Sequence, residues 1–239
     1  MKRFLSLFLI LAALFSLSGC DSFEDTPETD AAFAAYEAAV KQSIAHKKGA
    51  ITVMTENKDT VVENVDSIGV IEYSYATDEA GKVSFERNDF TNGEEVAAYY
   101  SDGKAAFQMD MATGKWVDVT EVSGAMLEHD KNIFNNLSLF RIDHNFRYSK
   151  RFYESVSMEE AQGEKIITVV IKNSELDAMF DLSDEKEIRR EMCSQVRKFY
   201  VNEEGDFYKI AIETLQNVTY KGKSGTLSNK IDVTLNYED

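Results

Sequence analysis

Short β-type segments separated by turn sequences run through most of this chain. Residues 51–55, 67–77 and 82–89 are rich in Val, Ile, Tyr, Phe and Thr, which favour strands. Residues 229–237 alternate apolar and polar side chains, the period of a half-buried strand. Further strands are expected over 146–155, 165–172, 198–202 and 207–219. Strands connected by such short turns run antiparallel, so we expect an antiparallel sheet.

The clearest hairpin spans residues 96–109, because Asp102-Gly103 is a dipeptide favoured in two-residue type I′ turns. Such a turn pairs Tyr100 with Ala105 and Ala98 with Phe107. It gathers six apolar residues on one face: Val96, Ala98, Tyr100, Ala105, Phe107 and Met109. A second turn at Thr113-Gly114 then places Met111 opposite Trp116.

One helix is predicted over residues 31–47, where apolar residues recur every three or four positions: Phe33, Tyr36, Val40 and Ile44. Asp30 is the expected N-cap, and Gly49 is the expected stop. A second helix is predicted over 183–196 from the spacing of Ile188, Met192 and Val196. Residues 174–180 are expected to form a helical turn, and 121–141 a helical or loop-like segment. Strands and helices in this order predict one α+β domain.

The N-terminus has the composition of a secretion signal. Met1-Lys2-Arg3 is basic, and the apolar run over 4–15 is shorter than the roughly twenty residues that a membrane-spanning helix needs. Leu17-Ser18-Gly19-Cys20 follows and resembles the bacterial lipobox, which implies that Cys20 carries a diacylglycerol thioether. An ordinary secreted protein with a chance cysteine is the alternative.

We therefore divide the chain into a signal peptide over 1–19, an acylated Cys20 with an acidic tether over 20–29, and a domain over 30–239. The expected location is the extracytoplasmic face of the cell membrane, held by the lipid anchor. Once Cys20 is acylated, only Cys193 remains, so the fold cannot depend on an internal disulfide.

The charge and the motifs of the chain argue against several classes of function. The chain has 42 Asp and Glu against 26 Lys and Arg, a net charge of -16, which opposes nucleic-acid binding. His46, His129 and His144 lack metal-site spacing. Ser101 and Lys104 fit S-x-x-K, but Asp102-Gly103 predicts a turn where that motif needs a helix. We expect no enzymatic activity, no cofactor and no metal.

Several short sequence segments, taken in order, resemble those of LolA-like and LppX-like bacterial lipoproteins. They are the lipobox, the acidic tether, the N-terminal helix, Tyr-Tyr-Ser-Asp-Gly-Lys-Ala at 99–105, Gly-Lys-Trp-Val at 114–117 and Glu-Glu-Gly-Asp at 203–206. The resemblance implies a curved antiparallel sheet, an open half-barrel, with helices packed on its concave face and space there for acyl chains.

Nine apolar residues are the candidates for lining such a cavity: Tyr100, Phe107, Met109, Trp116, Ile210, Ile212, Ile231, Val233 and Leu235. The alternative is that these side chains fill the core against the helices. Two functions correspond to these alternatives. The first is an anchored protein that binds a hydrophobic small molecule, a lipid or an acyl chain in the cavity. The second is an interaction or sensor module with a filled core and an envelope protein as its partner.

Overall fold

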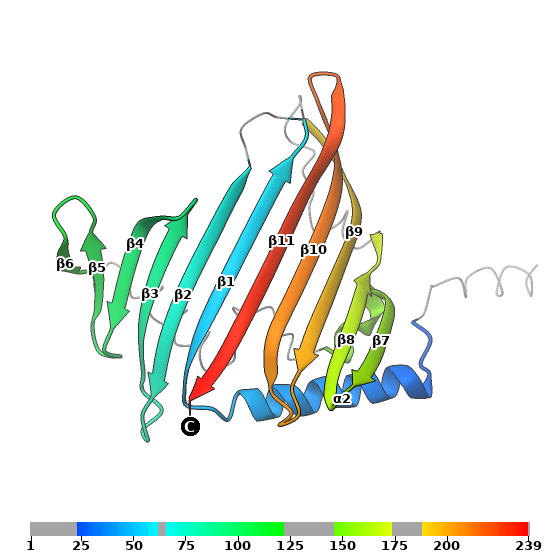
Figure 1. Ribbon diagram of the computed structural model, residues 1–239, viewed down its shortest axis with the longest axis horizontal. Helices are drawn as coiled ribbons and strands as arrows, with labels where there is room; N and C mark the ends of the chain where they lie inside the picture. Colours follow the sequence, from blue (N-terminus) through cyan, green and yellow to red (C-terminus); the bar gives the residue numbers. More distant parts are fainter. Residues whose placement is uncertain (1–22, 62–65, 122–145, 174–187, 239) are drawn as a thin grey trace, which may run out of the picture.

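The computed structural model describes residues 23–61, 66–121, 146–173 and 188–238, which form one open antiparallel sheet of eleven strands (Figure 1). The strand order is β6-β5-β4-β3-β2-β1-β11-β10-β9-β8-β7. The strands are β1 Lys48–Asp59, β2 Ser67–Thr77, β3 Val83–Thr91, β4 Glu94–Ser101, β5 Ala106–Asp110, β6 Lys115–Asp118, β7 Tyr153–Ala161, β8 Glu164–Ile171, β9 Ile188–Val201, β10 Phe207–Tyr220 and β11 Lys223–Glu238. The predicted antiparallel sheet is confirmed.

The pairing of β1 with β11 joins two meanders into this single sheet. It runs without interruption from Lys48 opposite Glu238 to Asp59 opposite Leu227. One meander is β1 to β6 and the other is β7 to β11, so β6 and β7 are the two edge strands. The first and last strands, β1 and β11, thus pair at the centre of the sheet. The edge strands β6 and β7 come from the middle of the sequence.

Helix α2, Pro27–Ser43, begins four residues before the predicted start at residue 31. Its N-cap is Thr26, whose hydroxyl accepts the Thr29 N–H at 3.2 Å, while the Thr29 hydroxyl accepts the Thr26 N–H at 2.9 Å. Pro27 opens the helix, where its missing N–H has no cost. The predicted Asp30 cap and the predicted tether beyond Thr26 are therefore wrong, and Gly49 lies in β1.

The α2 side chains that were predicted to face the core do so. Phe33 and Tyr36 are fully buried. The Tyr36 ring stacks on Phe146 at a centroid distance of 3.8 Å and meets Phe199 edge-on at 4.9 Å. We call the sheet face that carries Phe199 and its apolar neighbours Ile51, Ile210, Val233 and Leu235 the helix-side face, and the opposite face the outer face.

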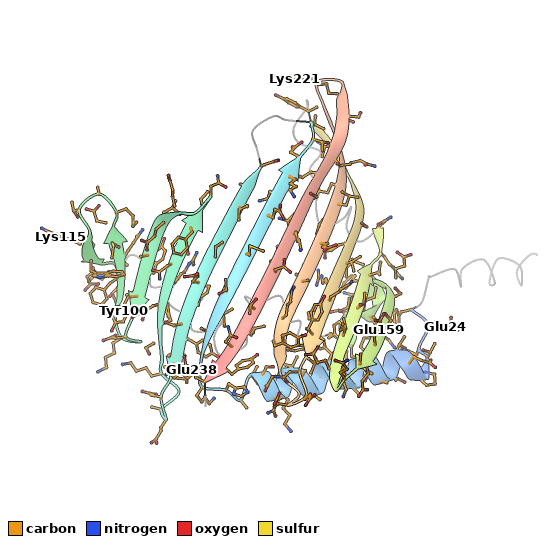
Figure 2. All side chains as sticks on the ribbon, in the orientation of Figure 1. Glu24, Tyr100, Lys115, Glu159, Lys221 and Glu238 are labelled. Atoms are coloured by element: carbon orange, nitrogen blue, oxygen red, sulfur yellow. The ribbon has the colours of Figure 1, made fainter. Side chains whose placement is uncertain are left out.

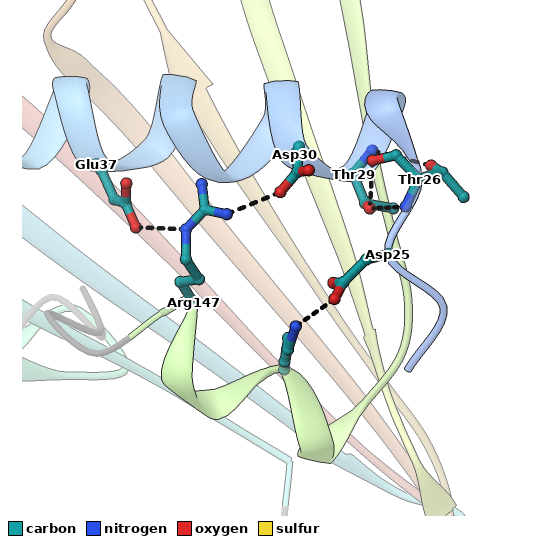
Figure 3. Close-up of polar contacts among 7 residues, drawn as sticks. Asp25, Thr26, Thr29, Asp30, Glu37 and Arg147 are labelled. Carbon is teal, nitrogen blue, oxygen red and sulfur yellow. Dashed lines mark hydrogen bonds and ion pairs between the residues drawn. The ribbon is translucent and has the colours of Figure 1, made fainter. Parts of the chain in front are cut away.

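Ion pairs hold the segment after Phe146 against α2 (Figure 3). Arg147 donates from Nη1 to Asp30 at 2.8 Å and from Nε to Glu37 at 3.1 Å. This segment continues into a short 3-10 helix, η2 Tyr148–Phe152, so the strand predicted from residue 146 starts only at Tyr153.

The C-terminal end of α2 is fixed to the strands by buried polar contacts. The Phe207 N–H donates to the Ser43 hydroxyl at 2.9 Å, and the Tyr237 hydroxyl donates to the Phe207 carbonyl at 2.9 Å. His46 contacts Asp206 at 3.0 Å and stacks on the Tyr237 ring. The end of α2, the turn between β9 and β10, and the last strand β11 thus contact one another at one point.

The helix predicted over 183–196 is wrong, because Ile188–Val201 forms strand β9 paired with β10. A spacing of four residues suits a helix face, but it is also two periods of a strand.

Residues 174–180, 183–187 and 122–141 lie outside the described part. In the part that is described, α2 is the one α-helix, and it is not long and apolar enough to cross a bilayer.

Candidate ligand site

The β4–β5 turn has four residues, 102–105, where the sequence predicted two. Tyr100 lies opposite Phe107, and Ser101 lies opposite Ala106. The Asp102 carboxylate accepts the N–H groups of Lys104 and Ala105 at 2.7 and 2.9 Å, which stabilises the wider turn. The predicted pairings of Tyr100 with Ala105 and of Ala98 with Phe107 are therefore wrong.

The next turn is also wider than predicted, so Met109 and not Met111 lies opposite Trp116. Both hairpins differ from the prediction by two residues. A shift of two leaves every strand residue on its predicted face. Tyr100, Phe107, Met109 and Trp116 thus share one face, the outer face, as the sequence indicated.

The outer face carries an ordered row of side chains across four strands. Glu86 of β3 lies opposite Tyr100 of β4, Tyr100 lies opposite Phe107 of β5, and Phe107 lies opposite Asp118 of β6. Trp116 is two residues before Asp118 and projects from the same face. Two aromatic rings thus stand between two carboxylates.

Glu86, Tyr100, Phe107 and Trp116 of this group line a cavity of about 480 Å³, which we call the aromatic recess. Its lining residues are Glu86, Asn88, Tyr99, Tyr100, Phe107 and Trp116. Tyr100 and Phe107 are near parallel, with centroids 5.9 Å apart, and Trp116 meets Tyr100 edge-on at 6.4 Å. Trp116 is 48% exposed and Tyr100 36%, so solvent reaches the rings. Figure 2 shows Tyr100 near one edge of the sheet.

The recess is bordered by negative charge. The Thr120 hydroxyl and backbone N–H hold the pKa of Asp118 below its usual range, so this carboxyl is ionised at neutral pH. None of the six lining residues is a Lys or an Arg. A cationic or neutral ligand is therefore compatible with the recess, whereas an anion meets repulsion.

The other five predicted residues lie on the helix-side face. Ile210, Ile212, Val233 and Leu235 are at most 4% exposed, and Ile231 is partly buried against them. They belong to the core cluster that includes Tyr36 and Phe207. The structure thus separates the nine candidates into an outer group and a core group on opposite faces of one sheet.

Sequence reasoning missed Glu86, Asn88 and Tyr99. The first two follow the core residue Phe85 at odd spacings in β3, so they face outward, paired with Tyr100 and Ala98. Their positions depend on the pairing of β3 with β4, which the sequence analysis did not assign. Among the described residues, no group of three His, Cys, Asp or Glu side chains is placed to hold a metal ion.

No protein-family model and no curated protein matches the chain. Solved structures that it resembles include a LolA superfamily protein from Nitrosomonas europaea, at 9% identity over 87% of this chain and 94% of that chain, with a TM-score of 0.29. The MucA/MucB complex of Pseudomonas aeruginosa matches at 8% identity over 82% and 57%, with a TM-score of 0.36.

A third match is a putative outer membrane lipoprotein-sorting protein domain from Vibrio parahaemolyticus, at 9% identity over 87% of this chain and 93% of that chain, with a TM-score of 0.23. The chain is thus similar to LolA-like structures, as its sequence predicted.

Proposed function

We propose that this chain is a lipid-anchored, extracytoplasmic binding protein that takes a ligand with a hydrophobic surface in the aromatic recess. The observation that carries the proposal is the solvent-reached cavity of about 480 Å³ walled by Tyr100, Phe107 and Trp116. Concave sites with apolar walls and a few polar groups are the usual ligand sites of proteins. The proposal includes binding alone, without a catalytic step.

The helix-side face supports this placement because its space near α2 is filled by the protein itself. Phe33, Tyr36, Phe199 and Phe207 are fully buried there. The rings of Tyr36, Phe199 and Phe207 contact one another, and the Phe33 ring contacts Phe146. A ligand at that point would have to displace packed aromatic side chains, which is costly in a close-packed core. The outer-face rings need no such displacement.

The N-terminal end of α2 and the recess lie toward opposite edges of the sheet. The chain enters the domain at Phe23, whose ring contacts Phe33 of α2 at 5.8 Å. This end of α2 lies beside β7, whereas the recess is formed by β3 to β6 at the other edge (Figure 1). An anchor at Cys20 would therefore hold the domain by its β7 side and leave the recess accessible.

A protein partner is a second candidate function, favoured by the exposed apolar residues of this edge. The apolar residues Val96, Tyr100, Met111 and Trp116 are 36–50% exposed. Apolar patches of this kind often mark interaction surfaces. Within the described residues β6 is also an edge strand, and a strand of a partner could pair with it. In this case the partner would cover the recess and no small ligand would be retained.

The proposal is tested with N-phenyl-1-naphthylamine, a neutral apolar dye whose emission rises in apolar sites. Trp116 is the only tryptophan, so energy transfer from it reports dye bound near the recess. We expect transfer in the wild type and its loss in Phe107→Glu. The matched control is Val117→Glu, which adds the same charge on the same edge but on the opposite face. Equal binding by Phe107→Glu, shown by circular dichroism to be folded, would overturn the proposal.

A further inference from the structure

The aromatic row of the recess ends in a carboxylate on each side. Glu86 borders Tyr100, and Asp118 borders Phe107, each as a direct cross-strand neighbour. Side chains paired in this way have Cβ atoms about 4.5–5.5 Å apart. No ion pair neutralises Glu86 within the described part of the chain. A ligand above these rings would therefore lie close to two negative charges.

The rings themselves favour the same sign of charge. An aromatic face carries partial negative charge, and a cation within about 6 Å of the ring centroid is attracted to it. Tyr100 and Phe107 are inclined by only 25°, whereas Trp116 is turned by 64° from Tyr100. The recess thus presents ring faces in two directions, as the walls of an aromatic cage do.

The size of the recess and its exposure to solvent favour some cations over others. A primary ammonium is compact and strongly hydrated, so it gains little from ring faces that remain in contact with water. A quaternary ammonium is bulkier and weakly hydrated, and its methyl groups match apolar walls. Aromatic cages that recognise this group combine such walls with cation–π attraction.

We propose that the aromatic recess binds a quaternary ammonium group such as that of choline. This inference rests on the proposed function, since it names the ligand class of the same recess. Tyr100, Phe107 and Trp116 form the walls, and the carboxylate of Glu86 balances the positive charge. Asp118 adds a longer-range attraction from β6.

The test compares choline with 3,3-dimethyl-1-butanol, which has the same shape but carbon in place of the charged nitrogen. The full chain is held in vesicles of phosphatidylethanolamine and phosphatidylglycerol, which contain no quaternary ammonium group. Trp116 fluorescence follows binding at constant ionic strength, because the protein has no other tryptophan. We expect choline to bind about tenfold more tightly than the neutral isostere.

Two variants locate the source of this preference. Glu86→Gln should weaken choline binding about fivefold and leave binding of the neutral isostere unchanged. Glu159→Gln is the matched control, because it removes an exposed carboxylate from β7 at the other edge of the sheet (Figure 2) and should change neither affinity.

The outcomes separate this inference from the proposed function. Equal affinities for choline and the isostere, with apolar dye still bound, would overturn the quaternary ammonium inference and leave the binding function standing. A choline preference that Glu86→Gln and Glu159→Gln reduce equally would also overturn it, because the effect would then come from overall charge. If the wild-type protein binds neither the dye, nor choline, nor the isostere, both proposals are contradicted.

Discussion

Tyr100 of β4 lies directly opposite Phe107 of β5, with ring centroids 5.9 Å apart, and not opposite Ala105. This register brings Glu86 and Asp118 into the same row, because the neighbouring strands pair in step with it. A shift by one residue would send Phe107 to the helix-side face and dismantle the recess. The turn at 102–105, closed by the Asp102 carboxylate, therefore positions the candidate site.

Replacement of Ile210 by Ala should lower the free energy of unfolding by about 2–5 kcal/mol, because the side chain is fully buried under α2 and leaves a cavity. Val96→Ala, at a residue that is 50% exposed, should change it by less than about 1 kcal/mol. Urea titrations measure both values. Similar losses in the two variants would contradict the assignment of Ile210 to the core.

Helix α2 should depend on Thr26 more than on Asp30. Thr26→Ala removes a capping hydroxyl and should cost about 1 kcal/mol. Asp30→Ala breaks only a solvent-exposed ion pair with Arg147 and should cost less than about 0.5 kcal/mol. Thermal or urea unfolding distinguishes them, and a larger loss in Asp30→Ala would restore Asp30 as the cap.

Alkaline pH should destabilise the protein through its buried tyrosines. Burial raises the pKa of Tyr75 to about 12, and burial also raises the pKa of Tyr237. The unfolded chain releases these protons near pH 10. Because the folded protein keeps them, its stability is complete below about pH 10 and falls as the pH rises toward 12.

Tyr75→Phe isolates this effect. The free energy of unfolding, measured in urea between pH 9 and 11, should fall less steeply in the variant than in the wild type. Lysine titration is common to both proteins and cancels in the comparison. Parallel slopes would show that Tyr75 does not contribute.

Acylation of Cys20 should decide whether the protein is retained in the membrane fraction. Wild-type protein should incorporate an alkyne-tagged fatty acid and sediment with membranes, and Cys20→Ala should do neither. Immunoblotting of fractionated cells measures retention. Incorporation of the tag by Cys20→Ala would place the modification elsewhere.

The sheet was largely predictable from sequence because period-two alternation and turn residues specify strands locally. β2 occupies residues 67–77, as predicted, and β8 and β10 begin or end within one residue of their predicted bounds. The strand predicted over 198–202 forms the C-terminal part of β9. The first part of β9, 188–196, was predicted as a helix because Ile188, Met192 and Val196 satisfy both periods. Its long pairing with β10 is a tertiary interaction that local spacing does not contain.

The candidate site was predictable only in part. Local alternation placed Tyr100, Phe107, Met109 and Trp116 on one face, which the structure confirms. The relation of that face to the face of Ile210 and Val233 depends on the order of strands across the whole sheet. Alternation in the sequence assigns the residues of each hairpin to one of its two faces. It does not show which faces of two distant hairpins lie on the same side of the sheet.

Binding in the aromatic recess is tested by native mass spectrometry of the protein purified from a bacterial envelope fraction, followed by extraction of the bound molecule. We expect a stoichiometric adduct in the wild type and in Val117→Glu, and no adduct in folded Phe107→Glu. A mass without adduct in the wild type despite available ligand, or an adduct that Phe107→Glu retains, would contradict binding in the aromatic recess.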